Sequence, residues 1–344
     1  MKKHPIMKKI FLLLITLLLV SSCSKKEGLY KETRVIMGTY VTITLNESGK
    51  SQDDLTKAAS DAFAQIEKVD ELMSTYKPES NLSLINQSAG IAPVQADPEV
   101  IDVIEKALYV AKLTDGAFDV TVGPLVQAWK IGSEDARVPS PDEIRKALTL
   151  VGWRNIEIDK HAGTIFIRKR GASIDLGGIA KGYASDMAVR VLKKAGIKGG
   201  IVACAGDIKV FGVRPDGTLW TVGIQHPRKA HGELMAKLPL TDCAVSTSGD
   251  YERYFLKDGV RYHHILDPRT GYPARGLMSV TVLSKESWLS DSMGKLFVLG
   301  PKKAYALALK HPEIEVLMIS DAGKVLATGR FRGLKVAPVE PDKK

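Results

Sequence analysis

Residues 173–192 read SIDLGGIAKGYASDMAVRVL. The apolar start, the glycine pair and the helical pattern after it predict a strand that ends at an acid, a tight turn and a helix. Free amides and the dipole at such a helix start favour an anion. Lys181 adds a positive charge, and Asp175 offers an acceptor for a ribose hydroxyl or a ring N–H. The turn matches neither G-x-G-x-x-G nor the P-loop pattern, so alone it indicates either an anion site or a structural turn.

Residues 1–22 have the pattern of a lipoprotein signal peptide. Four lysines precede an apolar run at 10–20, and two serines come directly before Cys23. The run is shorter than the about 20 residues that a membrane-spanning helix needs. We therefore expect cleavage before Cys23 and lipid attachment to it; a plain secretory leader and an uncleaved membrane anchor are the alternatives. Residues 23–30 are polar and charged, as a lipid-anchored tether would be.

Charge and cysteine content exclude some classes of protein. The net charge of +10 falls to +6 once the four lysines of the leader are removed. No stretch clusters Lys and Arg with aromatic residues, which argues against a nucleic-acid partner and favours phosphates or an anionic membrane surface. Cys204 and Cys243 are too few for a disulfide framework and lack the spacing of metal ligands. They form either one disulfide or two buried thiols.

Helices and hairpins are mixed along the rest of the chain. Apolar residues make up 44% of the sequence, enough for a large core in one domain or two lobes. This mixture predicts an α+β fold rather than a series of βαβ units. The predicted strands are 34–45 with a close approach or bulge at Gly38, a hairpin of 156–158 and 164–168, a second hairpin of 209–213 and 220–224, and single strands at 244–247, 279–283 and 316–320. The predicted helices are 53–73, one that Asp97 caps and that ends near Gly116, one from Leu289 onward, and 302–310.

Four further loops place a glycine beside an acid, an aromatic residue or a histidine. They read IMGTY at 36–40, DGAFDVTVGPL at 115–125, CAGDIKVFG at 204–212 and HHILDPRTGYP at 263–273. Each is an ordinary turn by itself. Together they predict a binding site assembled from several loops.

Seven motifs in a fixed order identify a resemblance: MGTY, MSTYKPESNLSLIN, GAFDVTVGPL, IDLGGIAKGYASD, AGDIKVFG, HHILDPRTGYP and SDSMGKLFVLG. Over about residues 30–330 the chain resembles the ApbE family, the FAD:protein FMN transferases. The resemblance implies an ApbE-like, T-fold-related α+β fold with mixed sheets, packed helices and two closely associated lobes around an FAD site. The family domain would cover 31–335, and a polar tail would cover 336–344.

The resemblance also implies an activity. Members bind FAD and Mg2+, transfer FMN to a threonine or serine of a target protein through a phosphoester bond, and release AMP. Their targets are flavin-carrying subunits of Na+-translocating NADH:quinone reductases and Rnf-type complexes. The lipid anchor would hold this chain on the periplasmic side of a bacterial membrane, inner or outer, with no nucleic-acid partner.

Site residues follow from the matching motifs. The resemblance implies FAD contacts at Met37, Tyr76, Ala117, Phe118, Asp119, Asp175, Lys181 and Ile265. Met, Tyr and Phe side chains can line an aromatic ring system, and carboxylates can accept hydrogen bonds from adenine or ribose.

The implied metal positions are the carbonyl of Gly178, Asp291 and the residue four beyond it. That residue is Lys295, where the family usually has threonine or another small oxygen-bearing residue. An ammonium cannot ligate Mg2+. Lys295 would instead offer its backbone carbonyl, or its side chain would contact a diphosphate oxygen. Asp291 alone is also explained as an acid near a helix N-terminus.

His264 is the predicted general base. It lies in the H-x-(I/L)-D-P element, and an unshifted imidazole is largely neutral at pH 7. The adjacent His263 could be mistaken for this base when either histidine is mutated. Asp267 could orient the loop at 263–273. Two alternatives stay open: an FAD pyrophosphatase that directs water at the same diphosphate, and a non-catalytic FAD-binding lipoprotein in which Lys295 marks a decayed metal site.

Overall fold

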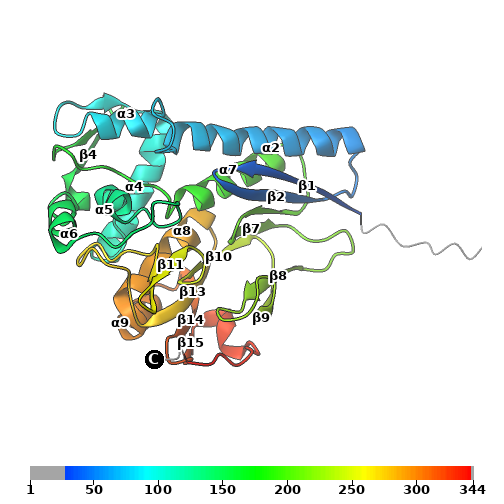
Figure 1. Cartoon of the computed structure of the whole chain (residues 1–344). Coiled ribbons are helices and arrows are strands. Elements are labelled where there is room, and N and C mark those ends of the chain that lie inside the picture. Colours follow the sequence, from blue (N-terminus) through cyan, green and yellow to red (C-terminus); the bar gives the residue numbers. More distant parts are fainter. Residues whose placement is uncertain (1–27, 342–344) are drawn as a thin grey trace, which may run out of the picture.

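A computed structural model describes residues 28–341, so the predicted signal peptide and Cys23, the predicted site of lipid attachment, lie outside the described residues. An eight-stranded sheet runs through the centre of the molecule (Figure 1), and neighbouring strands in it are antiparallel. From one edge to the other it consists of β1 (Leu29–Ile36), β2 (Thr39–Asn46), β6 (Gly200–Cys204), β7 (Asp207–Phe211), β10 (Cys243–Gly249), β13 (Leu277–Ser284), β14 (Ile314–Ser320) and β15 (Val325–Ala327).

Helices cover one face of this sheet and build the largest core. They are α2 (Gln52–Met73), α4 (Pro98–Leu113), α7 (Ala180–Lys194), α8 (Ser287–Met293) and α9 (Gly300–Lys310), with the 3-10 turn η3 (Gly294–Leu299) between the last two. A capping box of Ser51 and Asp54 starts α2. Its buried stripe, which includes Phe63 and Ile66, shares a core with Ile43 and Val280 of the sheet. Helix α7 packs between α2 and α8.

The opposite face is covered by a two-stranded ribbon and the C-terminal segment. The ribbon is β8 (Trp220–Gln225) with β9 (Leu234–Leu240), and the 3-10 turn η4 (Gly329–Gly333) lies near it. Trp220, Leu238 and Phe331 form a second core against Leu317 and Ile319 of β14. Because side chains alternate across a strand, β14 supplies both cores.

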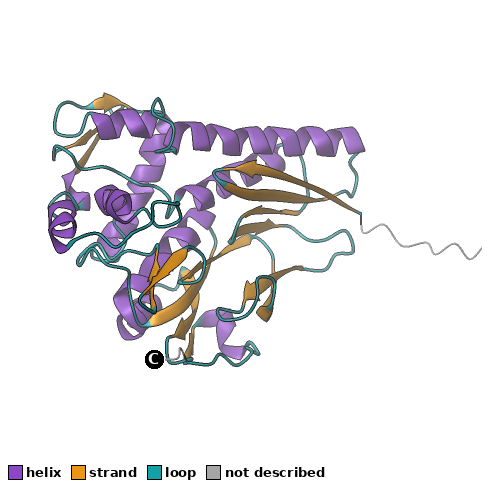
Figure 2. Cartoon of the chain, in the orientation of Figure 1, coloured by secondary structure: helices purple, strands orange, loops and turns teal. Residues whose placement is uncertain are grey.

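Smaller elements form a helical side of the molecule, at the left and top of the view in Figure 2. Trp129, Ile144 and Leu266 form a third core, and Trp129 Nε1 donates to the carbonyl of Gly271 at 2.7 Å. This bond ties the loop at 263–273 to a helix. The elements are α3 (Asn81–Gln87), α5 (Gly123–Trp129), α6 (Pro141–Leu148), the 3-10 turns η1 (Val120–Val122) and η2 (Trp153–Asn155), the sheet β3 (Val94–Gln95), β5 (Thr164–Ile167) and β4 (Ile156–Asp159), and the pair β11 (Tyr254–Lys257) and β12 (Val260–His263).

The α+β class and most long elements are confirmed. Asp97 caps α4, β4 and β5 form the predicted hairpin, and α2 and α9 occupy the predicted helical ranges. The structure contains free thiols at Cys204 and Cys243, both buried. Within residues 28–341, no helix combines the length and apolar character needed to cross a bilayer.

Three strand predictions are wrong. Residues 34–45 form a hairpin instead of one strand, because Met37 and Gly38 both have positive φ, 55° and 66°, as a tight primed turn requires. The predicted hairpin of 209–213 and 220–224 does not form: β7 pairs with β6 and β10, while β8 pairs with β9. Residues 173–175 form no strand and join no sheet.

Structured residues lie beyond both ends of the predicted domain range, 31–335. Strand β1 begins at Leu29, inside the predicted tether. The predicted polar tail packs against the fold, since the Ala337 amide donates to Met235 at 2.8 Å and Val339 belongs to the second core. The charged residues after Val339 made this segment look like a polar tail in the sequence, but the Val339 side chain is buried.

Candidate active site

The turn at 175–178 is held by backbone hydrogen bonds. The Asp175 amide donates to the carbonyl of Val120 at 2.7 Å, and its carboxylate accepts from the Gly177 amide at 2.8 Å. Helix α7 begins after this turn without a side-chain cap of its own. Asp291 of α8 takes that place, because its Oδ2 accepts from the Gly182 amide at 3.1 Å. Asp291 therefore stabilises the start of α7 rather than its own helix.

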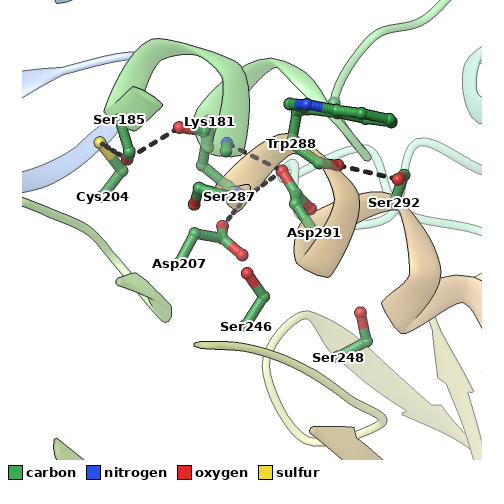
Figure 3. Close-up of polar contacts among 12 residues, drawn as sticks. Lys181, Ser185, Cys204, Asp207, Ser246, Ser248, Ser287, Trp288, Asp291 and Ser292 are labelled. Atoms are coloured by element: carbon green, nitrogen blue, oxygen red, sulfur yellow. Dashed lines mark hydrogen bonds and ion pairs between the residues drawn. The ribbon is translucent and has the colours of Figure 1, made fainter. Parts of the chain in front are cut away.

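Lys181 lies between two buried acids. Its ammonium donates to Asp207 and lies 3.7 Å from Asp291 Oδ2. Burial alone would lower the pKa of Lys181, but the two carboxylates outweigh it and raise that pKa. Burial and the Asp291 charge in turn raise the pKa of Asp207. Both carboxylates and the hydroxyls of Ser246 and Ser248 point into the same space (Figure 3).

Lys295 adds a second ammonium to this cluster. Its Nζ lies 3.5 Å from Asp291 Oδ1 and donates to the Asp291 carbonyl and to Ser248 Oγ, each at 3.2 Å. A Cβ built on Gly178 would lie 3.1 Å from Lys295 Cε and 3.3 Å from the Phe118 ring. The structure thus brings together the three predicted metal positions and one predicted FAD contact.

The two adjacent histidines differ in how many of their ring nitrogens make hydrogen bonds. His263 is 2% exposed; its Nε2 faces the Ala274 carbonyl at 2.8 Å, and its Nδ1 accepts from the Ile265 amide at 3.3 Å. Both of its nitrogens are thereby used. His264 has only Nδ1 bonded, at 3.3 Å from the Arg253 carbonyl. Because a carbonyl can only accept, Nδ1 carries the proton and Nε2 keeps its lone pair.

Electrostatics keep His264 neutral. Burial, then the charge of Lys295, then His263 lower the pKa of His264 to about 3. An imidazole with this pKa carries a free lone pair at neutral pH but is a weak base, so a general base at this position requires its pKa to be raised when an anionic ligand binds.

Acidification should destabilise the fold in part through His263. Burial lowers its pKa to about 4, so the unfolded chain takes up a proton at higher pH than the folded chain does. The stability contribution is fully present above the unfolded pKa of about 6.5, and about 3 kcal/mol is lost as pH falls toward the folded pKa. Urea unfolding at several pH values should give a flatter profile for His263→Asn. Exposed His161→Asn is the control, and parallel profiles for His263→Asn and wild type would contradict the assignment.

The remaining predicted FAD contacts fall into two groups. Ala117, Phe118 and Ile265 are buried near the loops just described. Met37 lines a hollow of about 310 Å³ together with Lys77, which brings the β1–β2 turn near the loop of Tyr76. The Tyr76 side chain itself is 91% exposed and does not pack against the other contacts.

Asp119 already has three partners inside the protein. Its carboxylate accepts from the Thr121 amide at 2.8 Å, from the Thr121 hydroxyl at 2.6 Å and from the Trp153 amide at 2.9 Å. Burial raises the pKa of Asp119. The side chain thus shapes the loop around Phe118, and a carboxylate with about four lone-pair positions keeps room for one further donor.

Sequence reasoning missed three residues of the cluster. Asp207 stands in the AGDIKVFG motif, which indicated a site loop but not the ion pair with Lys181. Ser248 and Arg253 carried no signal, because they follow from the path of β10 and the loop after it. The charge of Arg253 acts on both Asp175 and His264.

Gly182→Ala should separate α7 from α8. A Cβ at this position would lie 2.3 Å from the Ser287 carbonyl oxygen and 2.9 Å from Asp291 Cβ, both on a packed helix. We expect a loss of about 1–3 kcal/mol, the usual cost of overpacking. Thermal unfolding of this variant beside Ala184→Gly, a cavity-forming change on the same helix, measures it. An unchanged melting temperature for Gly182→Ala would contradict the close approach.

Comparison with known proteins identifies the family of this chain. The family model described as the ApbE family matches residues 37–318. The chain belongs to the ApbE family. It is 31% identical to the FAD:protein FMN transferase of Treponema pallidum (strain Nichols), with 95% of each chain covered. It is 34% identical to that of a classical Vibrio cholerae O1 strain, with 93% of this chain and 96% of the relative covered.

Solved ApbE structures have the same fold. The ApbE protein of Thermotoga maritima superposes with a TM-score of 0.82 at 35% identity, covering 89% of this chain and 99% of that one. The flavin transferase ApbE of Vibrio cholerae gives 0.79 at 31% identity, covering 88% and 98%. The predicted family and its fold are therefore confirmed over most of the chain.

Proposed function

We propose that this chain is an FAD:protein FMN transferase that uses FAD as substrate and a serine or threonine hydroxyl of a target protein as acceptor. The observation that carries the proposal is the pairing of an ApbE fold with His264, whose Nε2 is free beside the lysine cluster. The hydroxyl oxygen bonds to the FMN-side phosphorus of FAD. The bond from that phosphorus to the AMP oxygen breaks, and AMP leaves.

Each residue of the cluster has a definite task in this reaction. His264 Nε2 accepts the hydroxyl proton, because it is the unbonded nitrogen of a neutral ring. Positive charge on Lys295 and Arg253 attracts the diphosphate and stabilises charge on the phosphoryl oxygens. Lys181 keeps Asp207 and Asp291 compensated and so maintains the start of α7. His263 is a positioning residue that holds the loop through its two backbone bonds.

The Mg2+ that the resemblance implies requires oxygen ligands. Asp291 Oδ2 already accepts from Gly182 and lies beside Lys181, while its Oδ1 faces the Lys295 ammonium. These residues do not fit a divalent cation, and the reaction above is therefore derived from the side chains alone.

The proposed place of action is the periplasmic side of a bacterial membrane. The leader pattern of residues 1–22 and Cys23 supports lipid anchoring there. The proposed acceptors are flavin-carrying subunits of Na+-translocating NADH:quinone reductases or Rnf-type complexes, which such an anchor would leave within reach.

Incubation of the chain with FAD and a candidate subunit tests the proposal. The subunit carries the motif S/T-G-A-S/T, and its matched control has alanine at the acceptor hydroxyl. In-gel flavin fluorescence and the mass of the subunit report bound FMN, and chromatography reports AMP. Labelling of the intact motif only, with one AMP per FMN, is the expected result. Free FMN beside an unlabelled subunit would indicate the pyrophosphatase instead, and unchanged FAD would indicate a flavin-storing lipoprotein.

A further inference from the structure

We propose that the Lys295 ammonium is the built-in cation of this site, which binds the FAD diphosphate where a divalent metal ion would otherwise be held by Asp291. The inference rests on FAD being the ligand, as proposed above. It predicts that FAD binding does not depend on a divalent metal ion in this chain.

The Lys295 ammonium lies among the oxygens of Asp291 and Ser248. Its Nζ contacts three oxygens at the predicted metal position of Asp291: Oδ1 and the carbonyl of Asp291, and Ser248 Oγ. The fourth oxygen, Asp291 Oδ2, accepts from the Gly182 amide. A metal ion placed among these atoms would have to displace the ammonium and would be repelled by it.

Packing holds the ammonium in place. The Lys295 side chain is 19% exposed, and its Cε would lie only 3.1 Å from a Cβ at Gly178. Any residue other than glycine at 178 would push against the lysine stem. The glycine beside Phe118 thus gives the Lys295 stem its space.

The charges of the cluster are balanced within the protein. Asp207 pairs with Lys181, and Asp291 lies between Lys181 and Lys295. The two acids are therefore matched by two ammoniums before any ligand binds. In the absence of FAD, a divalent ion would leave the buried cluster with an excess of positive charge, which is costly in a low-dielectric interior.

An ammonium has three N–H groups, and Lys295 uses two of them for the Asp291 carbonyl and Ser248 Oγ. The third faces Asp291 Oδ1 at 3.5 Å, longer than an ordinary N–H···O bond. A diphosphate oxygen within ordinary hydrogen-bond distance would accept from this N–H better than the carboxylate oxygen at 3.5 Å.

Equilibrium binding tests the inference on the purified full chain. FAD affinity is measured by quenching of flavin fluorescence, once with Mg2+ and once with EDTA, and Mn2+ binding is measured by electron paramagnetic resonance with FAD present. For the wild type we expect the two affinities to agree within about threefold, and no stoichiometric Mn2+ signal from bound ion. A drop of about tenfold or more in EDTA, or one tightly bound Mn2+ per chain, would overturn the proposal.

Lys295→Thr supplies the converse measurement. It removes the ammonium and adds a hydroxyl beside Asp291, so FAD affinity in EDTA should fall about 10- to 100-fold, and Mg2+ should restore much of it. Lys302→Thr, an exposed lysine of α9, is the matched control and should behave like the wild type. If Lys295→Thr binds FAD weakly in EDTA and Mg2+ does not improve the affinity, Lys295 does not occupy the place of a metal ion at Asp291. If Lys295→Thr does not fold, the wild-type measurement alone decides.

The binding assay contains no acceptor protein. Its result therefore tests the role of Lys295 separately from the proposed transferase activity. A chain that binds FAD equally in EDTA and Mg2+ but labels no acceptor keeps the inference and loses the transferase. A chain that labels its acceptor and loses FAD affinity in EDTA keeps the transferase and loses the inference.

Discussion

His264→Ala is expected to lower the rate of FMN transfer about 100- to 10,000-fold, the usual contribution of a positioned general base. The lost atom is Nε2, which has no partner among the described hydrogen bonds, whereas Nδ1 bonds only to the Arg253 carbonyl. FAD affinity should change less than about threefold, because the charges that attract the diphosphate lie on Lys295 and Arg253. Single-turnover flavinylation of an acceptor subunit measures the rate, and fluorescence quenching measures the affinity.

His161→Ala is the matched control, since that histidine lies in an exposed turn between β4 and β5. Its rate should equal the wild-type rate. A His264→Ala rate within about threefold of wild type would remove the general base from the mechanism.

The pH profile adds a second readout for His264. Burial and the charges of Lys295, His263 and Arg253 lower its pKa to about 3 in the free protein, so the base stays unprotonated as pH falls from neutral. Accordingly, kcat/KM should show no loss near pH 6.5 from this group. In the FAD complex the diphosphate opposes the lysine charge and raises the pKa, so the acid limb of kcat should lie at higher pH than that of kcat/KM.

Lys181→Met should have the largest effect on stability. It leaves Asp207 and Asp291, which are 6% and 2% exposed, without the ammonium that lies between them. Removing one member of a buried ion pair costs about 3–5 kcal/mol, because an uncompensated charge stays in the interior. Urea unfolding at neutral pH measures the loss.

The double variant Lys181→Met/Asp207→Asn separates charge from packing. It removes one acid together with the lysine and should regain a large part of the lost stability, since one uncompensated charge disappears. Lys303→Met, on the exposed face of α9, should change stability by less than about 0.5 kcal/mol. Equal destabilisation by the single and double variants would contradict the electrostatic explanation.

Long amphipathic elements were predictable because their signals are local. The buried stripe of α2 repeats over several turns and follows a capping box, and Asp97 stands directly before α4. Short elements were not. The hairpin of β1 and β2 depends on two residues of positive φ, and one of them is Met37, which gives no turn signal.

Strand pairing was the weakest prediction, because a turn between two strands does not decide their partners. A turn at 214–218 does form, with the Arg214 amide donating to Thr218 at 2.9 Å, yet β7 enters the main sheet and β8 the ribbon. The reason is burial: β7 lies inside the main sheet, whereas Trp220 of β8 belongs to the core on the other face. Cross-sheet packing of this kind leaves no local pattern.

The sequence by itself determined the family and predicted a set of site loops and a general base, because ordered motifs with glycines and one H-x-(I/L)-D-P element are local features of the chain. Only the tertiary structure decided which atoms meet. It distinguished His264 from His263 through the partners of their nitrogens, made Asp291 a cap for α7, and placed Lys295 on the oxygens of Asp291 and Ser248. The turn at 175–178 became part of a site only when α8 and β10 placed charges against it. Hydrogen bonds and ion pairs depend on distances of a few ångströms between segments far apart in the chain, and folding alone sets those distances.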